Sequence, residues 1–137
     1  MWDDLGEYIA NKATDSNKKD NSSFKIVEIA IGKFFYVADY LKNYNSNSIE
    51  FIATDINPAN ENIVFDDITN PNMKIYENVD VLYSIRPPQE LQPYITDIAK
   101  KTGAILIIKP FFNEDLNVAI KMNLVNYKKA TFYQSIK

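Results

Sequence analysis

Hydrophobic residues follow two different periodicities along the chain. Spacings of three and four over residues 2–13 predict an amphipathic helix. Residues 14–23 are polar and predict a flexible linker. From Phe24 onward, short β-branched runs alternate with segments of helical spacing. The predicted strands cover residues 24–31, 49–54, 63–65, 79–85, 104–108, 124–127 and 131–136, and the remaining predicted helices cover residues 34–44, 89–101 and 114–121.

The predicted strands are mostly continuous in hydrophobicity, which is typical of strands covered on both faces. Strands that alternate with helices favour an open, mostly parallel sheet with helices on both sides. The last two strands predict an antiparallel edge to this sheet. We therefore expect an α/β fold, a Rossmann-like, doubly wound α/β/α sandwich that forms a single domain over residues 1–137.

Composition removes whole classes of chemistry. The 137 residues include no cysteine and no histidine, which excludes thiol nucleophiles, Ser-His-Asp triads, zinc fingers and haem or iron–sulfur proteins. A net charge of −3 argues against a general nucleic-acid binder. We see neither a secretory signal nor an apolar run of membrane-spanning length, so we expect a cytoplasmic protein that is not embedded in a membrane.

Ligands of open parallel sheets bind beyond the carboxyl ends of the strands, so the residues that close each strand are the candidates. Gly32 follows the first strand, where it either presents free N–H groups to a ligand or simply makes the turn. Phe34 would crowd a pyrophosphate at this loop and disfavours a full dinucleotide. Asp55 closes the second strand, where it either accepts hydrogen bonds from ribose hydroxyls or bonds its own backbone in a turn.

Asp66 and Asp67 close the third strand. They could reach an adenine amino group from one side of the same pocket, or they could cap a turn. Two neighbouring carboxylates can also hold magnesium, but the chain has no phosphate-binding Gly-Lys-Ser/Thr loop to accompany them. We therefore expect no metal site.

Arg86 is the chain's one arginine among 15 basic residues, and it closes the fourth strand. An arginine in a chain that otherwise uses lysine indicates a need for the planar guanidinium, which can form two parallel hydrogen bonds to one anionic group. It could hold a carboxylate or phosphate of a small-molecule ligand, with Lys109 on the rim of the same cleft. The alternative is a structural salt bridge, for instance to Glu28 or Glu114.

The strand-end segments 27–32, 53–56, 65–67 and 83–88 resemble, in that order, the motifs of Rossmann-like S-adenosylmethionine-dependent methyltransferases. Two segments resemble a small uncharacterised archaeal family more closely, and that family is itself methyltransferase-like. These segments are Gly-Lys-Phe-Phe after the first strand and Ser-Ile-Arg-Pro-Pro-Gln-Glu-Leu-Gln-Pro after the fourth, and the similarity extends over nearly the whole chain from Phe24.

This resemblance implies that the chain binds S-adenosylmethionine or a related nucleoside and transfers a methyl group to a small or anionic acceptor. It implies contacts of Glu28 and Gly32 with the methionine end, of Asp55 with the ribose, and of Asp66 or Asp67 with the adenine. In the enzyme hypothesis Arg86 holds the acceptor, and Tyr83 or Ser84 lies near the transferred group. The competing hypothesis is a non-catalytic regulatory protein of the same fold that binds a nucleoside or a protein partner.

The sequence departs from the methyltransferase pattern at several points. Ala30 and Phe34 stand where glycine is usual, which puts the cofactor loop in question. Residues 85–88 lack the Asp or Asn that amino-group methyltransferases carry before Pro-Pro, so we do not expect an amine acceptor held in that way. The chain also has no evident substrate-recognition insert, which a protein partner or a second subunit of a homo-oligomer could supply.

Overall fold

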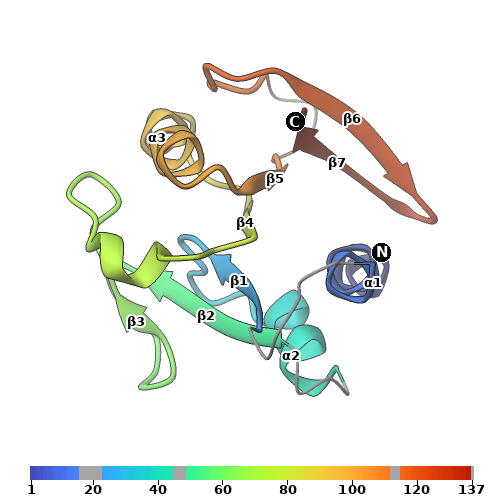
Figure 1. The fold of residues 1–137 in the computed structure, drawn as a ribbon, viewed down its shortest axis with the longest axis horizontal. Helices are drawn as coiled ribbons and strands as arrows, with labels where there is room; N and C mark the ends of the chain where they lie inside the picture. The colour runs from blue at the N-terminus through green and yellow to red at the C-terminus, as the bar shows by residue number, and fades with distance from the viewer. Residues whose placement is uncertain (16–22, 45–48, 112–114, 137) are drawn as a thin grey trace.

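One seven-stranded sheet organises the molecule, in the order β3-β2-β1-β4-β5-β7-β6 (Figure 1). The computed structural model describes residues 1–15, 23–44, 49–111 and 115–136. Strands β1 to β5 pair in parallel, while β7 runs antiparallel to both β5 and β6. The strands are β1 (Phe24–Glu28), β2 (Ile49–Asp55), β3 (Val64–Phe65), β4 (Val81–Ile85), β5 (Ile105–Lys109), β6 (Met122–Tyr127) and β7 (Ala130–Ser135).

Helices cover both faces of the sheet, as the doubly wound prediction requires (Figure 1). Buried residues of α1 and α2 pack in one core cluster with inward-facing residues of β1, β4 and β5, whereas α3 packs in a second cluster on the opposite face. In β4, for example, Val81 and Tyr83 belong to the first cluster and Leu82 to the second. The helices are α1 (Trp2–Thr14), α2 (Tyr36–Asn43), α3 (Gln92–Thr102) and the short 3₁₀ turns η1 (Met73–Tyr76) and η2 (Gln89–Leu91).

The expected α/β fold with a mostly parallel sheet is thus confirmed. The antiparallel strand, however, is β7, which lies inside the sheet between β5 and β6. Since β6 is antiparallel to β7, the edge strand β6 runs in the same direction as β5.

The helix predicted at 114–121 is wrong for residues 115–121, which form no helix. Leu116, Val118 and Ile120 are half-buried against the α3-side core, while the residues between them are exposed. This period of two belongs to extended chain rather than to a helix. The Gln92 side chain at the start of α3 replaces one missing backbone partner, since its Oε1 accepts from the N–H of Asn117 at 2.7 Å. Residue 114 and most of the predicted linker lie outside the described residues.

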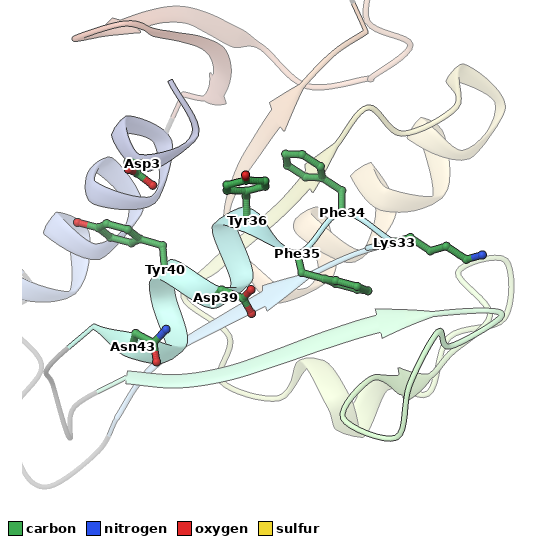
Figure 2. Close-up of a pocket in the computed structure, with 8 residues that line it drawn as sticks. All are labelled: Asp3, Lys33, Phe34, Phe35, Tyr36, Asp39, Tyr40 and Asn43. Carbon is green, nitrogen blue, oxygen red and sulfur yellow. The ribbon is translucent and has the colours of Figure 1, made fainter.

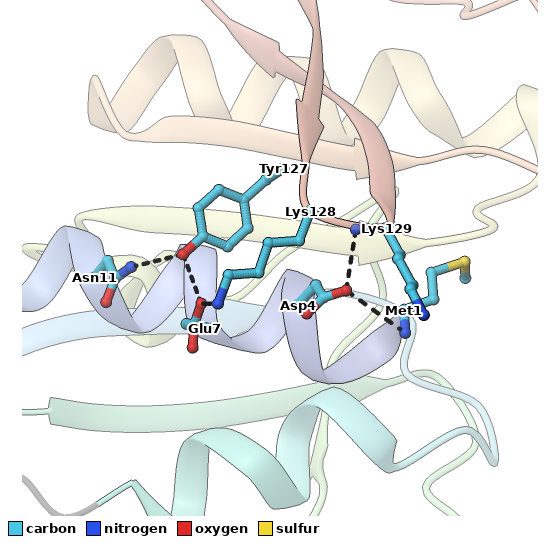
Figure 3. Close-up of polar contacts among 7 residues, drawn as sticks. All are labelled: Met1, Asp4, Glu7, Asn11, Tyr127, Lys128 and Lys129. Atoms are coloured by element: carbon cyan, nitrogen blue, oxygen red, sulfur yellow. Dashed lines mark hydrogen bonds and ion pairs between the residues drawn. The ribbon is translucent and has the colours of Figure 1, made fainter.

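Helix α1 is fixed on two sides. Its Gly6 lies so close to α2 that a Cβ there would come within 2.6 Å of the Tyr40 ring. On the other side, Glu7 accepts hydrogen bonds from Tyr127 and Lys128 in the β6–β7 hairpin, and Asp4 accepts one from the N–H of Lys129 (Figure 3). These contacts hold the first turn of α1 beside the carboxyl ends of β4 and β5. Among the described residues, no helix combines the length and the apolar character needed to cross a membrane.

Candidate functional site

The β1–α2 loop reverses direction through two residues with left-handed backbone, Ala30 at φ 58° and Gly32 at φ 60°. Glycine adopts this conformation freely, whereas a residue with a Cβ is strained by about 1 kcal/mol or more. Apart from Gly32 and its two chain neighbours, no described residue has an atom within 4 Å of the position that a Cβ on Gly32 would take. Gly32 is therefore needed for its backbone conformation rather than for space.

Asp55 links the ends of β1 and β2. Its Oδ2 accepts a hydrogen bond from the N–H of Gly32 at 2.8 Å, and its Oδ1 accepts one from the N–H of Asn57 at 2.9 Å. The turn interpretation of Asp55 is thus confirmed. A carboxylate can accept about four hydrogen bonds, so these two leave capacity for ribose hydroxyls.

Beyond these strand ends lies a cavity of about 340 Å³, a size typical of small-molecule sites. Its walls are largely apolar, with polar groups contributed by the ends of β2 and β3. We call it the strand-end cavity. It is lined by Ile29, Ala30, Thr54, Asp55, Ile56, Asp66, Asp67, Ile68, Thr69, Tyr76, Pro88 and Leu91.

The two carboxylates after β3 differ in their surroundings. Asp66 is buried, and it accepts hydrogen bonds from the N–H of Asn72 at 2.8 Å and from the Tyr76 hydroxyl at 2.6 Å. Burial and this carboxylate raise the pKa of Tyr76. Asp67 is only half-buried, and one of its oxygens accepts from both the N–H and the hydroxyl of Thr69. Of the two, Asp67 is the one with an accessible carboxylate, while Asp66 holds the turn.

Glu28, Tyr83 and Ser84 lie inside the protein. The Tyr83 hydroxyl donates to Glu28 Oε1 at 2.6 Å, and the Ser84 hydroxyl donates to the carbonyl of Ile29 at 2.7 Å. Each side chain is at most 1% exposed, and the cavity lining given above includes none of them. Burial raises the pKa of Glu28 to about 8, and burial beside Glu28 raises the pKa of Tyr83. Their predicted contacts with cofactor or acceptor stay predictions.

Arg86 is exposed at the carboxyl end of β4, and its backbone is also left-handed at φ 55°. Its N–H donates to the carbonyl of Lys109 at 2.6 Å. The guanidinium carbon lies 5.2–5.8 Å from the ring centroids of Trp2, Phe34 and Phe111. These three rings offer cation–π contacts that hold the guanidinium in place. The alternative ion pair with Glu28 is not formed, because Glu28 faces Tyr83 in the core, and Glu114 lies outside the described residues.

Phe34 points away from the strand-end cavity and into this aromatic cluster. Its ring centroid is 4.6 Å from that of Trp2 and 5.6 Å from that of Tyr36. The expected crowding of a ligand at the cofactor loop therefore does not arise on the side of the strand-end cavity. Trp2, Phe111 and the apolar wall of the cavity were not among the predicted site residues. The wall could have been found from the isoleucines that follow Asp55 and Asp67 directly.

The seven-stranded sheet has a methyltransferase-like fold. The fold is similar to that of an S-adenosylmethionine-dependent methyltransferase from Aquifex aeolicus, with a TM-score of 0.58 and 11% identity over 96% of this chain and 89% of that one. It is also similar to the CurJ carbon methyltransferase, with a TM-score of 0.54 and 17% identity over 77% of this chain and 34% of that one. At such identities the likeness shows the fold alone.

The chain belongs to the uncharacterised protein family UPF0146, whose family model matches residues 7–137. A UPF0146 protein of Methanothermobacter thermautotrophicus is 40% identical and covers 99% of this chain and 96% of its own length. A relative from Methanocaldococcus jannaschii is 43% identical, covering 93% of this chain and 90% of its own length. The predicted resemblance to a small archaeal family with a methyltransferase-like fold is thus confirmed.

Proposed function

We propose that this protein binds S-adenosylmethionine or a related nucleoside in the strand-end cavity and transfers its methyl group to a small or anionic acceptor. The observation that carries this proposal is the position of Asp55. Its carboxylate is held at the cavity wall by two backbone N–H groups, next to the loop that precedes α2. A carboxylate fixed in this way is suited to accept both hydroxyls of a ribose.

The other residues of the cavity fit the same ligand. Ile56, Ile68 and Leu91 offer apolar surface for the faces of an adenine ring, and Asp67 can accept from its amino group. Ala30 of the β1–α2 loop lines the cavity, while Gly32 of the same loop lies outside the lining and donates its N–H to Asp55. The Phe34 ring packs against Trp2 and does not line the cavity. S-adenosylmethionine supplies an electrophilic methyl group when bound, so the chain's own task is to bind and orient.

For the acceptor, Arg86 offers a guanidinium at the carboxyl end of β4, two residues before Pro88 of the strand-end cavity lining. The guanidinium itself lies among Trp2, Phe34 and Phe111, outside that lining. The surrounding rings limit its motion, which favours bidentate binding of a carboxylate or phosphate. If this proposal holds, Arg86→Lys lowers the transfer rate about tenfold and leaves the fold intact, because an ammonium lacks the planar fork.

A non-catalytic, nucleoside-binding regulator of the same fold is the second candidate. The observation that favours it is the burial of Tyr83 and Ser84, which leaves both hydroxyls engaged inside the protein and away from the cavity. Under this hypothesis Arg86 binds an anionic group of a protein partner instead of an acceptor.

Calorimetric titration with S-adenosylmethionine and S-adenosylhomocysteine tests the proposal. We expect saturable binding of both, with NMR shift changes at Gly32, Asp55 and Asp67. The absence of binding at millimolar ligand would refute both candidates. If binding occurs, release of S-adenosylhomocysteine in the presence of candidate carboxylate or phosphate acceptors separates the enzyme from the regulator.

A further inference from the structure

A second cavity, of about 490 Å³, lies where α1 meets α2 (Figure 2). We call it the helix groove. It shares no lining residue with the strand-end cavity, although residues 33–35 of the loop before α2 border it. It is lined by Asp3, Lys33, Phe34, Phe35, Tyr36, Asp39, Tyr40 and Asn43.

Four of the eight residues that line the groove are aromatic. Tyr36 is 65% exposed although it is a large side chain at the start of a helix. Tyr40 is packed against Gly6 of α1, which fixes its ring along the seam between the two helices. The groove therefore presents π surface to solvent at a concave site, where a ligand can be surrounded.

Two carboxylates belong to the groove wall. Asp3 comes from α1 and Asp39 from α2, and both are exposed. Lys33 extends to the opposite end of the groove, away from Asp3, Asp39 and Tyr40 (Figure 2). Besides burial, the negative charges of Glu7 and Asp3 raise the pKa of Tyr40. Two carboxylates, Asp3 and Asp39, thus stand against one lysine, Lys33, in the lining of the groove.

We propose that the helix groove binds a small organic cation, an alkylammonium ion, between Tyr36, Tyr40 and the carboxylates of Asp3 and Asp39. Aromatic faces attract such cations through the ring quadrupole, and the carboxylates add an attraction that an anionic or neutral ligand would not receive. The site is spatially separate from the proposed nucleoside site, because the two cavities share no lining residue.

The test is an NMR titration of the full chain with tetramethylammonium chloride, against sodium chloride at the same ionic strength. We expect saturable shifts of the Tyr36 and Tyr40 ring resonances that sodium does not produce, with a dissociation constant of about 1–10 mM. The absence of saturable shifts at these two rings would overturn the proposal.

Variants locate the site. Asp39→Asn should weaken tetramethylammonium binding about fivefold, and Tyr36→Leu about threefold, because each removes one attraction from an exposed position. Asp97→Asn is the matched control, since Asp97 is also exposed but lies on α3 across the sheet, and should leave the affinity unchanged. An equal loss in Asp39→Asn and Asp97→Asn would mean that net charge alone attracts the cation, and would refute a defined site.

Discussion

The polar residues that close the parallel strands form two groups with opposite surroundings. Glu28, Tyr83 and Ser84 are at most 1% exposed and bond with each other or with backbone inside the sheet. Asp55 closes the neighbouring strand β2, where two backbone N–H groups hold its carboxylate. Arg86 follows Ser84 by two residues and is held by aromatic rings. The buried residues link β1 and β4 by hydrogen bonds. Asp55 and Arg86 are placed where they can contact a ligand.

The difference comes from strand geometry. Side chains alternate between the two faces until the last paired residue, so a polar residue before that point is enclosed by a helix layer. Beyond it, left-handed residues such as Ala30 and Arg86 turn the chain outward. If this division is correct, variants of the buried group should change stability, and variants of the rim group should change binding.

Among the substitutions compared at a single pH, the largest effect is expected for Tyr83→Phe. The variant leaves the buried Glu28 without its hydroxyl donor, so we expect a loss of about 3 kcal/mol in the free energy of unfolding. Urea denaturation measures this loss, and Tyr94→Phe, at an exposed position on α3, is the control. Nucleoside affinity should stay the same. If Tyr83→Phe clearly weakens nucleoside binding without changing the free energy of unfolding, Tyr83 contacts the ligand, and the division into a buried and a ligand-binding group is wrong.

Asp55→Ala should affect nucleoside binding more than stability. We expect nucleoside binding to weaken about tenfold to a hundredfold, because the ribose loses its charged acceptor and the Gly32 loop loses its anchor. Calorimetry with S-adenosylhomocysteine gives the affinity, and Asp97→Ala is a control of equal charge change. Unchanged affinity in the Asp55 variant would place the ligand elsewhere.

Much of the fold could be predicted because the strands are recognisable from the local sequence alone. The continuous apolar runs that became β1, β4 and β5 are buried on both faces, and the parallel arrangement follows from their alternation with helices. Segment 115–121 was predicted wrongly because its apolar residues contact the core through an extended chain, which a short window cannot distinguish from a helix.

The candidate site could be predicted only in part. Asp55 was identifiable since its role depends on neighbours close to the strand ends, Gly32 and Asn57. The aromatic partners of Arg86 were not identifiable, because Trp2 and Phe111 come from distant parts of the chain that only the tertiary structure brings together. The burial of Glu28 and Tyr83 likewise depends on where α1 and α2 pack.

The pH dependence of stability sharpens the comparison further. Burial raises the pKa of Glu28 from an ordinary 4.5 to about 8 in the folded protein. Between these values the folded chain keeps a proton that the unfolded chain releases, so this group makes stability fall as pH rises from about 4.5 to about 8, by at most about 1.4 kcal/mol per pH unit. Glu28→Gln removes this contribution. Urea denaturation across this range should therefore show a flatter profile in the variant, and parallel profiles would contradict the assignment.

The smallest effect is expected at Ala30, which stands on the border between the two groups. Its backbone is left-handed at φ 58°, so its Cβ is strained, and Ala30→Gly should stabilise the protein by about 0.5–1 kcal/mol. Ala53→Gly is the matched control, because Ala53 is buried in β2, where the same change should destabilise by about 1 kcal/mol. Thermal unfolding of both variants measures the difference in sign. If both lose stability, the Cβ of Ala30 contributes more to the cavity wall than its strain costs, and Ala30 then belongs with the residues that shape the ligand site.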